Sequence, residues 1–491
     1  MTIAELMPFS VLIPLIAAPV CALLPGRLLP WALAMLATLA SALIMIQVLP
    51  VAVEEPVRYA FGNWQPPIGI EFRVDAVNAF IGLLVTLMAS VILPWARISV
   101  NQEIGDRRQG LFYALFLLAL SGLMGITMTG DAFNLFVFLE ISSLSTYALV
   151  AMGRSKAAPL SAFRYLIMGT LGATFYLIGV GLIYIMTGTL NMVDLAERLP
   201  AVADTRAVQA AFAFIIVGIG VKLALFPLHR WLPGAYANAP SAISVFLAST
   251  ATKVAVYVVL RLVFTVFGIE FARAMPYAEV FFVLGVFGIL LPSIWAIEHT
   301  NIKRLLAYSS VAQIGYIILA ISLLSVTGLT AGLVHLFNHA LIKGALFMCV
   351  CTVIYQTGSP NLSAFQGLGR QMPLTMLAFV LAGLSLIGVP LTAGFISKWV
   401  LIQAAIEQGS WLAVAVVLIG SLLAVVYIGK VAEAAWLKPA PEGRAPVREA
   451  RLGLLIPMWL LVAANIYFGL DTRLTLDIAT HGAEVLLGAQ P

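Results

Sequence analysis

Long apolar runs alternate with short polar segments along most of this chain of 491 residues. The runs are continuous and about 20 residues long, the length of a helix that crosses a bilayer, and they lack the alternation of membrane β-strands. We predict about fourteen transmembrane helices from this pattern. The predicted spans are 8–25, 29–50, 74–97, 111–129, 132–152, 162–187, 208–228, 240–264, 278–297, 305–326, 329–356, 374–405, 411–436 and 451–470.

Two of these helices contain sequences that interrupt a helix. The span 374–405 is too long for one straight crossing and contains Gly-Val-Pro at 388–390. The span 208–228 meets Pro227 near its end. Proline removes a backbone donor and clashes with the preceding turn, and broken helices are tolerated in membranes where the backbone lines a cavity or packs in protein. We therefore predict that the seventh and twelfth helices are broken.

Composition supports an all-α polytopic membrane protein. Hydrophobic residues make up 62% of the chain and charged residues 10%, against about 25% charged residues in soluble domains. The chain has 3 cysteines, too few to hold an iron–sulfur cluster alone, and we find no nucleotide-binding loop, catalytic triad or nucleic-acid motif. The sequence therefore predicts no cofactor, no metal, no nucleic-acid partner and no enzymatic activity of its own.

Basic residues gather in the loops that follow odd-numbered helices. They are Arg97, Arg107, Arg108, Arg154, Lys156, Lys303, Arg304, Arg370, Lys438, Arg444, Arg448 and Arg451. Loops rich in Lys and Arg stay on the cytoplasmic side. This pattern predicts an inner (cell) membrane protein with an even number of helices and with both termini on the outer, periplasmic face.

Several ionisable residues fall inside the predicted helices, where each costs several kcal/mol and is a functional candidate by default. They are Glu140, Lys222, Lys253, His335, His339, Lys343 and Lys398. A static buried ion pair that fixes helix packing would explain one such pair. A series of groups on successive helices favours proton transfer, because packing alone needs no such series. Glu140 and Lys222 have opposite charges and suit a pair that opens and closes.

The histidines form one stripe with a lysine. His335, His339 and Lys343 are spaced by four residues and so share a helix face. Histidine titrates near neutral pH and can shuttle protons. A zinc site is the rival interpretation, but no glutamate follows His335 directly, and Cys349 lies about 15 Å along the helix from His339. A hydrogen-bonded core histidine remains the alternative for either residue.

Weaker candidates lie at helix ends. Asp131 is placed to cap the fifth helix, and His229 follows the broken seventh helix, where it suits a gate on the cytoplasmic side or a plain loop. Lys222 near Pro227 and Lys398 near 388–390 are five helices apart. An odd offset between equivalent helices indicates an inverted repeat, a common transporter plan.

Several stretches resemble one family of membrane subunits. They are FLEISSLSTY, GVKLALFPLHRWLPGAYANAPSAIS, LASTATKVAVYVVLR, NIKRLLAYSSVAQIGY, HLFNHALIKGALFM and GVPLTAGFISKW. Together they resemble the antiporter-like subunits of Mrp-type Na⁺/H⁺ antiporters, respiratory complex I and membrane-bound hydrogenases. Chain length and the wording of the motifs favour the D-type subunits of Mrp antiporters within that group.

The resemblance implies about 14 helices with two inverted repeats of about five helices each. The expected regions are 1–110 for the first three helices, 111–265 and 278–436 for the two repeats, and 451–491 for the last helix and tail. The resemblance also implies a coupling pair and a line of proton-transfer residues. The pair would be Glu140 and Lys222, and the line would continue through Lys253, His335, His339 and Lys398.

The implied function is proton translocation in a multisubunit Na⁺/H⁺ antiporter, a secondary transporter with Mrp-like partner subunits that handles H⁺ and possibly Na⁺. The alternative is a proton-pumping subunit of a redox-driven complex related to complex I or to a membrane-bound hydrogenase. The ion path would be nearly the same in both.

Overall fold

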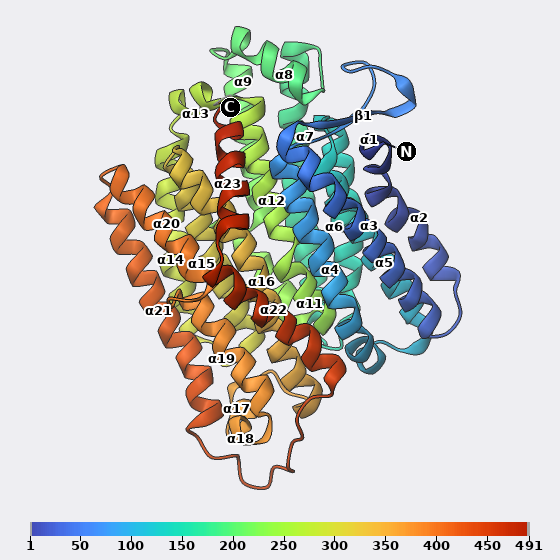
Figure 1. Ribbon diagram of the computed structural model, residues 1–491, viewed down its shortest axis with the longest axis vertical. Helices are drawn as coiled ribbons and strands as arrows, with labels where there is room; N and C mark the ends of the chain where they lie inside the picture. The colour runs from blue at the N-terminus through green and yellow to red at the C-terminus, as the bar shows by residue number, and fades with distance from the viewer. Residues whose placement is uncertain (1, 489–491) are drawn as a thin grey trace.

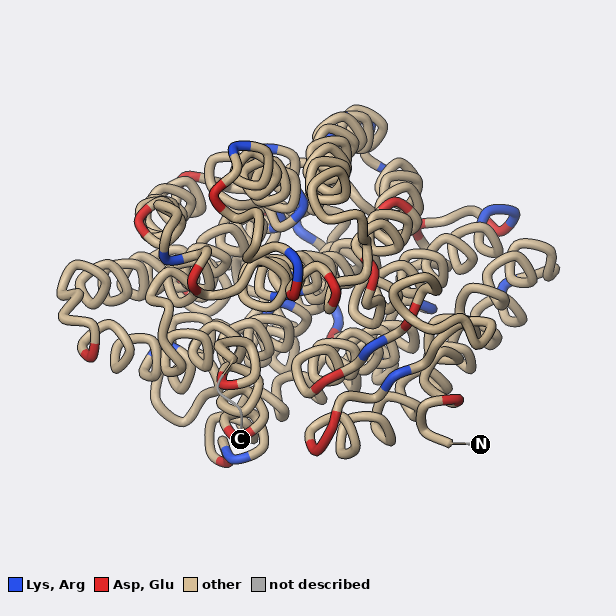
Figure 2. The backbone as a smooth tube through the Cα atoms, turned by 90° about the horizontal axis from the view of Figure 1, so that it is seen from above, with Lys and Arg blue, Asp and Glu red and all other residues tan. Residues whose placement is uncertain are grey.

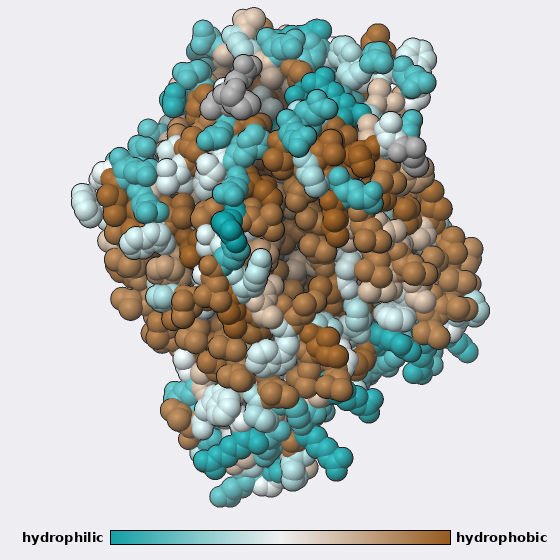
Figure 3. All heavy atoms as spheres, viewed as in Figure 1, coloured by the Kyte–Doolittle hydropathy of each residue, from teal (hydrophilic) through white to brown (hydrophobic). Residues whose placement is uncertain are grey.

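The computed structural model describes residues 2–488, and most of them are helical. Within this range, 13 helices are long and apolar enough to cross a membrane, and the broken pair α19–α20 supplies a further crossing. Figure 3 shows a broad apolar band across the middle of the face in view, with hydrophilic residues gathered at the two ends of the molecule. The predicted all-α polytopic membrane fold is confirmed.

The elements follow one another as a series of crossings (Figure 1). The first are α1 (Ile3–Leu6), α2 (Phe9–Leu23), α3 (Leu28–Glu54), α4 (Ala76–Glu103), α5 (Asp106–Met128), α6 (Ala132–Ala151) and α7 (Ala158–Thr187). The next are α9 (Arg206–Leu223), α10 (Leu232–Asn238), α11 (Ser241–Ser249), α12 (Ala251–Leu260), α14 (Tyr277–Glu298), α15 (Ile302–Ser322) and α16 (Val326–Thr357). The last are α19 (Pro373–Ile387), α20 (Ala393–Glu407), α21 (Trp411–Trp436), α22 (Leu452–Leu470) and α23 (Arg473–Leu486).

Shorter elements lie in the connections. They are β1 (Val57–Ala60), η1 (Phe61–Asn63), β2 (Glu71–Val74), α8 (Met192–Arg198), η2 (Leu199–Val202), η3 (Leu228–Trp231), the π-helical η4 (Arg261–Val266), α13 (Ile269–Ala274), α17 (Leu362–Phe365) and α18 (Leu368–Gln371). Strands β1 and β2 form an antiparallel hairpin. In Figure 1 the hairpin, α8 and both labelled chain ends lie toward the top, which we call the hairpin end, and α17 and α18 lie at the bottom, the far end.

Burial separates the central helices from the peripheral ones. Apolar windows of α11–α12, α15 and α16 are 94% buried, whereas those of α7, α14 and α21 are 39% buried. Charged residues are sparse along the tube in Figure 2. The central helices are the ones that carry Lys253, His335, His339 and Lys343, so these four side chains lie in the interior of the bundle.

Between residues 206 and 407, three crossings are broken, two of them as predicted. Helix α9 ends where Ala224 takes a left-handed conformation at φ 60°, before Pro227. Helix α19 ends at Gly388, whose φ of 93° suits glycine because it has no Cβ. The third break, at Thr250 between α11 and α12, was not predicted. Each break leaves backbone carbonyls without their usual helical donors.

Each half of the chain contains one of two matching bridges. Asp131 before α6 pairs with Asn191, and Asn301 before α15 pairs with Asn361. In both, the residue before the helix also caps it, since Asp131 accepts from the Asn134 amide and Asn301 from the Arg304 amide. The element α8 after the first bridge lies at the hairpin end and α17 after the second at the far end (Figure 1). This is the geometry that inverted repeats predict.

Candidate functional site

Glu140 and Lys222 meet at the edge of the bundle. Glu140 lies on α6 and Lys222 is the penultimate residue of α9, with 3.6 Å between Lys222 Nζ and Glu140 Oε1. The ammonium donates to neutral hydroxyls instead, at 2.7 Å to Ser143 and 3.3 Å to Tyr147. Within residues 2–488, Glu140 Oε1 is buried and accepts no hydrogen bond. The two charges are therefore close but not bonded, an arrangement that can open without breaking a hydrogen bond.

The end of α9 positions Lys222. The left-handed Ala224 turns the chain, and the Trp231 indole donates at 2.9 Å to the Val221 carbonyl, which also accepts from the Ala224 amide. A cavity of about 30 Å³ lies beside Lys222. Its lining includes Ser142, Ser143, Thr146 and, from the next crossing, Ala251, Val254 and Ala255. This volume is large enough for one water molecule, and the cavity lies between Lys222 and α12.

Lys253 follows the unpredicted break at Thr250. Its ammonium donates to the Ala248 carbonyl, one of the groups that this break exposes, and the Thr252 hydroxyl lies at 3.5 Å. The residue is 1% exposed. Among the described residues, the ion pairs include no carboxylate bound to Lys253, Lys343 or Lys398. Buried lysines without counter-ions are costly as static packing devices.

The stripe on α16 continues the line. His335 is held at both nitrogens, by the Ser397 hydroxyl at 2.8 Å from Nδ1 and by Gln313 Oε1 at 3.0 Å from Nε2. The ring of His339 lies 6.2 Å from that of His335, centroid to centroid. His339 is fully buried, and neither of its nitrogens has a hydrogen-bond partner within residues 2–488. An orphaned imidazole in a polar stripe is a natural place for a bridging water.

Lys343 lies one turn beyond His339 along the stripe. Its ammonium donates to the Leu306 carbonyl at 2.9 Å and to the Ser309 hydroxyl, both on α15. Lys343 is fully buried. It therefore belongs to the same polar interior as the histidines, on the face of α16 that packs against α15.

Lys398 sits on α20 just past the predicted break. Its ammonium donates to the freed carbonyls of Leu386 and Ile387 at 3.0 and 2.9 Å and to the Ser421 hydroxyl at 3.0 Å. It also lies 4.6 Å from the centre of the Tyr316 ring. Because the neighbouring Ser397 binds His335, α20 connects the α16 stripe to Lys398.

The auxiliary candidates take separate positions. Asp131 caps α6, accepting from the Asn134 amide at 2.6 Å; burial raises the pKa of its carboxyl, while bonds from the Asn134 and Phe133 amides lower it. His229 is buried between the rings of Phe226 and Trp295, with centroids 5.5 and 5.6 Å away. It lines a cavity of about 1010 Å³ that also contains Arg230. In the described part of the chain, no hydrogen bond or ion pair joins either residue to a lysine of the line.

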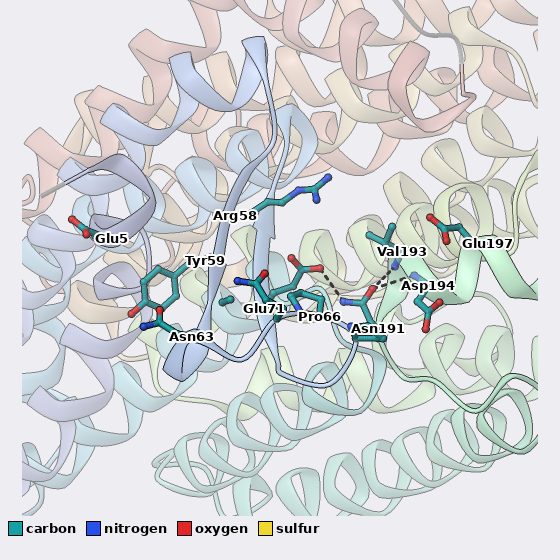
Figure 4. A pocket seen from close by; sticks show the side chains of 13 residues that line it. Glu5, Arg58, Tyr59, Asn63, Pro66, Glu71, Asn191, Val193, Asp194 and Glu197 are labelled. Atoms are coloured by element: carbon teal, nitrogen blue, oxygen red, sulfur yellow. Dashed lines mark hydrogen bonds between the residues drawn. The ribbon is translucent and has the colours of Figure 1, made fainter.

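A further cavity, of about 660 Å³, lies at the hairpin end. Figure 4 shows its acidic lining, which includes Glu71, Asp194 and Glu197. Asn191 donates to Glu71 at 2.9 Å and caps α8 with its other side-chain atom. This bond fastens the β-hairpin to the first bridge, so Glu71 has a structural partner.

The neutral side chains that contact the buried charges were not predicted from the sequence. Ser143, Tyr147, Gln313, Tyr316, Ser397 and Ser421 were not singled out as contacts. One signal was present, because Ser143 and Tyr147 lie three and seven residues after Glu140 and so share its helix face. The others come from different helices, and only the packing brings them together.

The chain is similar to known membrane subunits of antiporters and NADH-quinone oxidoreductases. Residues 129–424 match the family described as NADH:quinone oxidoreductase/Mrp antiporter, transmembrane. The N-type subunit of NADH-quinone oxidoreductase from Desulforudis audaxviator is 44% identical over 94% of this chain and 93% of its own length. The D-type subunit of the Na⁺/H⁺ antiporter from Alkalihalophilus pseudofirmus is 30% identical over 87% of this chain and 85% of its own length.

A solved structure shares the whole fold. A chain in the Mrp complex from Dietzia sp. DQ12-45-1b superposes with a TM-score of 0.91 at 26% identity, covering 99% of this chain and 98% of that one. The family match spans α6 to α21, the helices that carry every buried charge of the line. This chain belongs to the family of antiporter-like membrane subunits that Mrp antiporters share with NADH:quinone oxidoreductases.

Proposed function

We propose that this chain translocates protons across the membrane as one subunit of a hetero-oligomeric complex. The path runs from Glu140 and Lys222 through Lys253 and the α16 histidines to Lys398. The observation that supports it most is the set of three buried lysines, Lys253, Lys343 and Lys398, whose ammonium groups bond to hydroxyls and backbone carbonyls and have no carboxylate partner within residues 2–488. Lysine can change its protonation state readily when buried, whereas inert packing would favour apolar side chains here.

The Glu140–Lys222 pair is the proposed switch. While the charges are close, each stabilises the charged form of the other. When they separate, Lys222 keeps its bonds to Ser143 and Tyr147, and its proton is free to move through the small cavity toward α12. Water must bridge the steps between Lys253, His339 and Lys398, because no direct hydrogen bond joins these residues in the described part of the chain.

The partial exposure of Glu140 supports the presence of a neighbouring protein beside it. Its side chain is 23% exposed, and Phe133, Val137 and Leu144 on the same helix are also exposed. A partly exposed carboxylate at membrane depth needs a polar neighbour. We infer that another protein of the complex covers α6, in agreement with the solved relative, which is part of a complex.

Two kinds of complex are candidates for the assembly that contains this chain. The 44% identity to an N-type subunit of NADH-quinone oxidoreductase supports a redox-driven proton pump. The 30% identity to a D-type antiporter subunit supports the Mrp-type Na⁺/H⁺ antiporter that the sequence motifs favoured. Purification of the tagged chain from its native membrane, followed by mass spectrometry of its partners, separates them: quinone- or cofactor-binding subunits support the first, small Mrp subunits the second.

The relay itself is tested at Glu140. Glu140→Gln keeps the shape of the side chain but removes the charge that faces Lys222. We expect proton-coupled transport in membrane vesicles to fall at least about tenfold, as for loss of a proton-transfer group, with a normal amount of assembled complex. Glu433→Gln is the matched control, because Glu433 pairs with Lys438 on the surface, where an ion pair contributes little. Full transport by Glu140→Gln would refute the switch.

A further inference from the structure

The last helix of the described chain has one charged face. On α23 the buried side contains Thr475, Ile478, Ala479, Gly482, Ala483 and Leu486. The opposite side carries Arg473, Asp477, His481 and Glu484, spaced by four, four and three residues, so that they form a single stripe. Arg473, Asp477 and Glu484 are exposed. We call these four residues the α23 charged face.

Packing places the start of α23 at mid-membrane depth. Helix α22 ends against the break between α19 and α20, since a Cβ added at Gly469 would clash with the Thr392 backbone. That break divides a single crossing into two halves. Further along, Gly482 packs against Val77 at the beginning of α4. Helix α23 therefore occupies the half of the membrane layer nearer the hairpin end; Figure 1 shows it running from the end of α22 toward that end.

The charged face interrupts the apolar band at this depth. In Figure 3 a hydrophilic stripe runs from the hairpin end into the band, over the position of α23 in Figure 1. By contrast, the exposed side of α21 carries Leu418, Leu422 and Val425. Helix α21 is suited to lipid, whereas the side chain of Arg473, 85% exposed, is not.

The charges on this face are mainly acidic. Arg473 is paired with Asp471 at 2.7 Å, which neutralises both. In the described part of the chain, Asp477 and Glu484 take part in no ion pair. Charged groups inside membranes face protein or water and pair with other polar groups. The complement of this face is therefore basic or rich in hydrogen-bond donors.

We propose that the α23 charged face binds a transmembrane helix of another membrane-embedded subunit, one that carries basic or amide side chains in the half of the bilayer near the hairpin end. This surface is distinct from α6 and does not depend on the proton relay. Its partner is recognised by charge, and apolar packing around Leu474, 56% exposed, completes the contact.

Photo-cross-linking in the assembled complex tests the contact. A benzophenone amino acid replaces Asp477 in one variant and Leu422 of α21 in another. We expect the probe at 477 to form a covalent product with one membrane subunit, and the probe at 422 to form a lipid adduct or a product with a different subunit. Only lipid adducts at 477 would overturn the proposal. So would free labelling of Asp477→Cys by a membrane-impermeant maleimide in the complex, which would indicate an aqueous cleft.

Charge variants test the chemistry. The double variant Asp477→Lys and Glu484→Lys places like charges opposite a basic partner, and we expect recovery of the cross-linked subunit to fall about tenfold or more. Asp477→Asn with Glu484→Gln keeps hydrogen bonds and should bind with an intermediate loss. Glu433→Lys on α21 is the control and should not change recovery. Unchanged recovery in the lysine double variant, at normal abundance of the chain, would contradict a charge-based interface.

Discussion

Lys398 and Lys430 make similar hydrogen bonds in different settings. Lys430, half-buried on α21, donates to the carbonyls of Ile297 and His299 at the end of α14, at 2.9 and 3.2 Å. Lys398 donates to the carbonyls of Leu386 and Ile387 and to the Ser421 hydroxyl. Its neighbour Ser397 binds His335 of the α16 stripe. Both lysines can act as anchors of a helix end, but only Lys398 adjoins the buried titratable groups. The two lysines can thus separate anchoring from proton transfer.

Arginine at each position provides this separation. Arginine keeps the charge and the donors but does not deprotonate in proteins. We expect Lys398→Arg to assemble normally and to lose proton-coupled transport by at least about tenfold. Lys430→Arg should keep both assembly and transport. The measurement is the initial rate of proton movement in vesicles, normalised to the amount of complex. A wild-type rate and pH dependence in Lys398→Arg would leave Lys398 as an anchor only.

At the scale of single elements, the two bridges allow an internal comparison. Asp131 caps α6 and Asn301 caps α15, each in a bridge to an asparagine. Asparagine and aspartate are equally good capping residues. The cap of α15 carries no charge, which suggests that the charge of Asp131 is not needed to cap α6.

We therefore expect Asp131→Asn to preserve stability and transport. Asp131→Ala should destabilise the protein by about 1 kcal/mol, the usual effect of losing a cap. Thermal denaturation of the purified complex and vesicle transport measure the two properties. Asn301→Ala is the matched control and should show a similar loss of stability. If Asp131→Asn is stable but inactive, Asp131 has a role in transport that capping does not explain.

The elements also show what the sequence could predict. Long apolar runs located the apolar helices closely; the last was predicted at 451–470 and is α22, Leu452–Leu470. The break at Gly388 was predicted because glycine and proline signal it. The break at Thr250 carries neither residue, and the Lys253 ammonium satisfies an exposed carbonyl there. Helix α23 was missed because it is short and half polar, and its position depends on packing against α4 and α16.

The candidate site could likewise be predicted only in part from the sequence. Glu140, Lys222 and Lys398 stood out because a charge in an apolar helix is rare. The 3.6 Å approach of the first two joins α6 to α9, which lie far apart in the sequence and both pack against α7. Likewise, the bonds of His335 join α16 to α15 and α20. Such contacts are set by helix packing, and periodicity within one helix contains no information about them.

At the scale of the whole molecule, charge and fold are asymmetric across the apolar band. The hairpin end carries both described chain ends, and its cavity is lined by Glu71, Asp194 and Glu197. The far end carries the loop between α21 and α22, which contains Lys438, Arg444 and Arg448. Because basic loops remain cytoplasmic, we predict that the far end is cytoplasmic and that the hairpin end faces outward.

Two exposed glutamates test this orientation. Glu197 on α8 lies at the hairpin end and Glu442 lies in the far-end loop. In intact cells, a membrane-impermeant maleimide should label Glu197→Cys but not Glu442→Cys, and inside-out vesicles should show the reverse. The native cysteines Cys21, Cys349 and Cys351 are buried, so background labelling should be low. Labelling of Glu442→Cys alone in intact cells would contradict the predicted orientation and would show that the far end faces outward. The Glu140–Lys222 pair would be unaffected, but the direction in which this chain moves protons would have to be reversed.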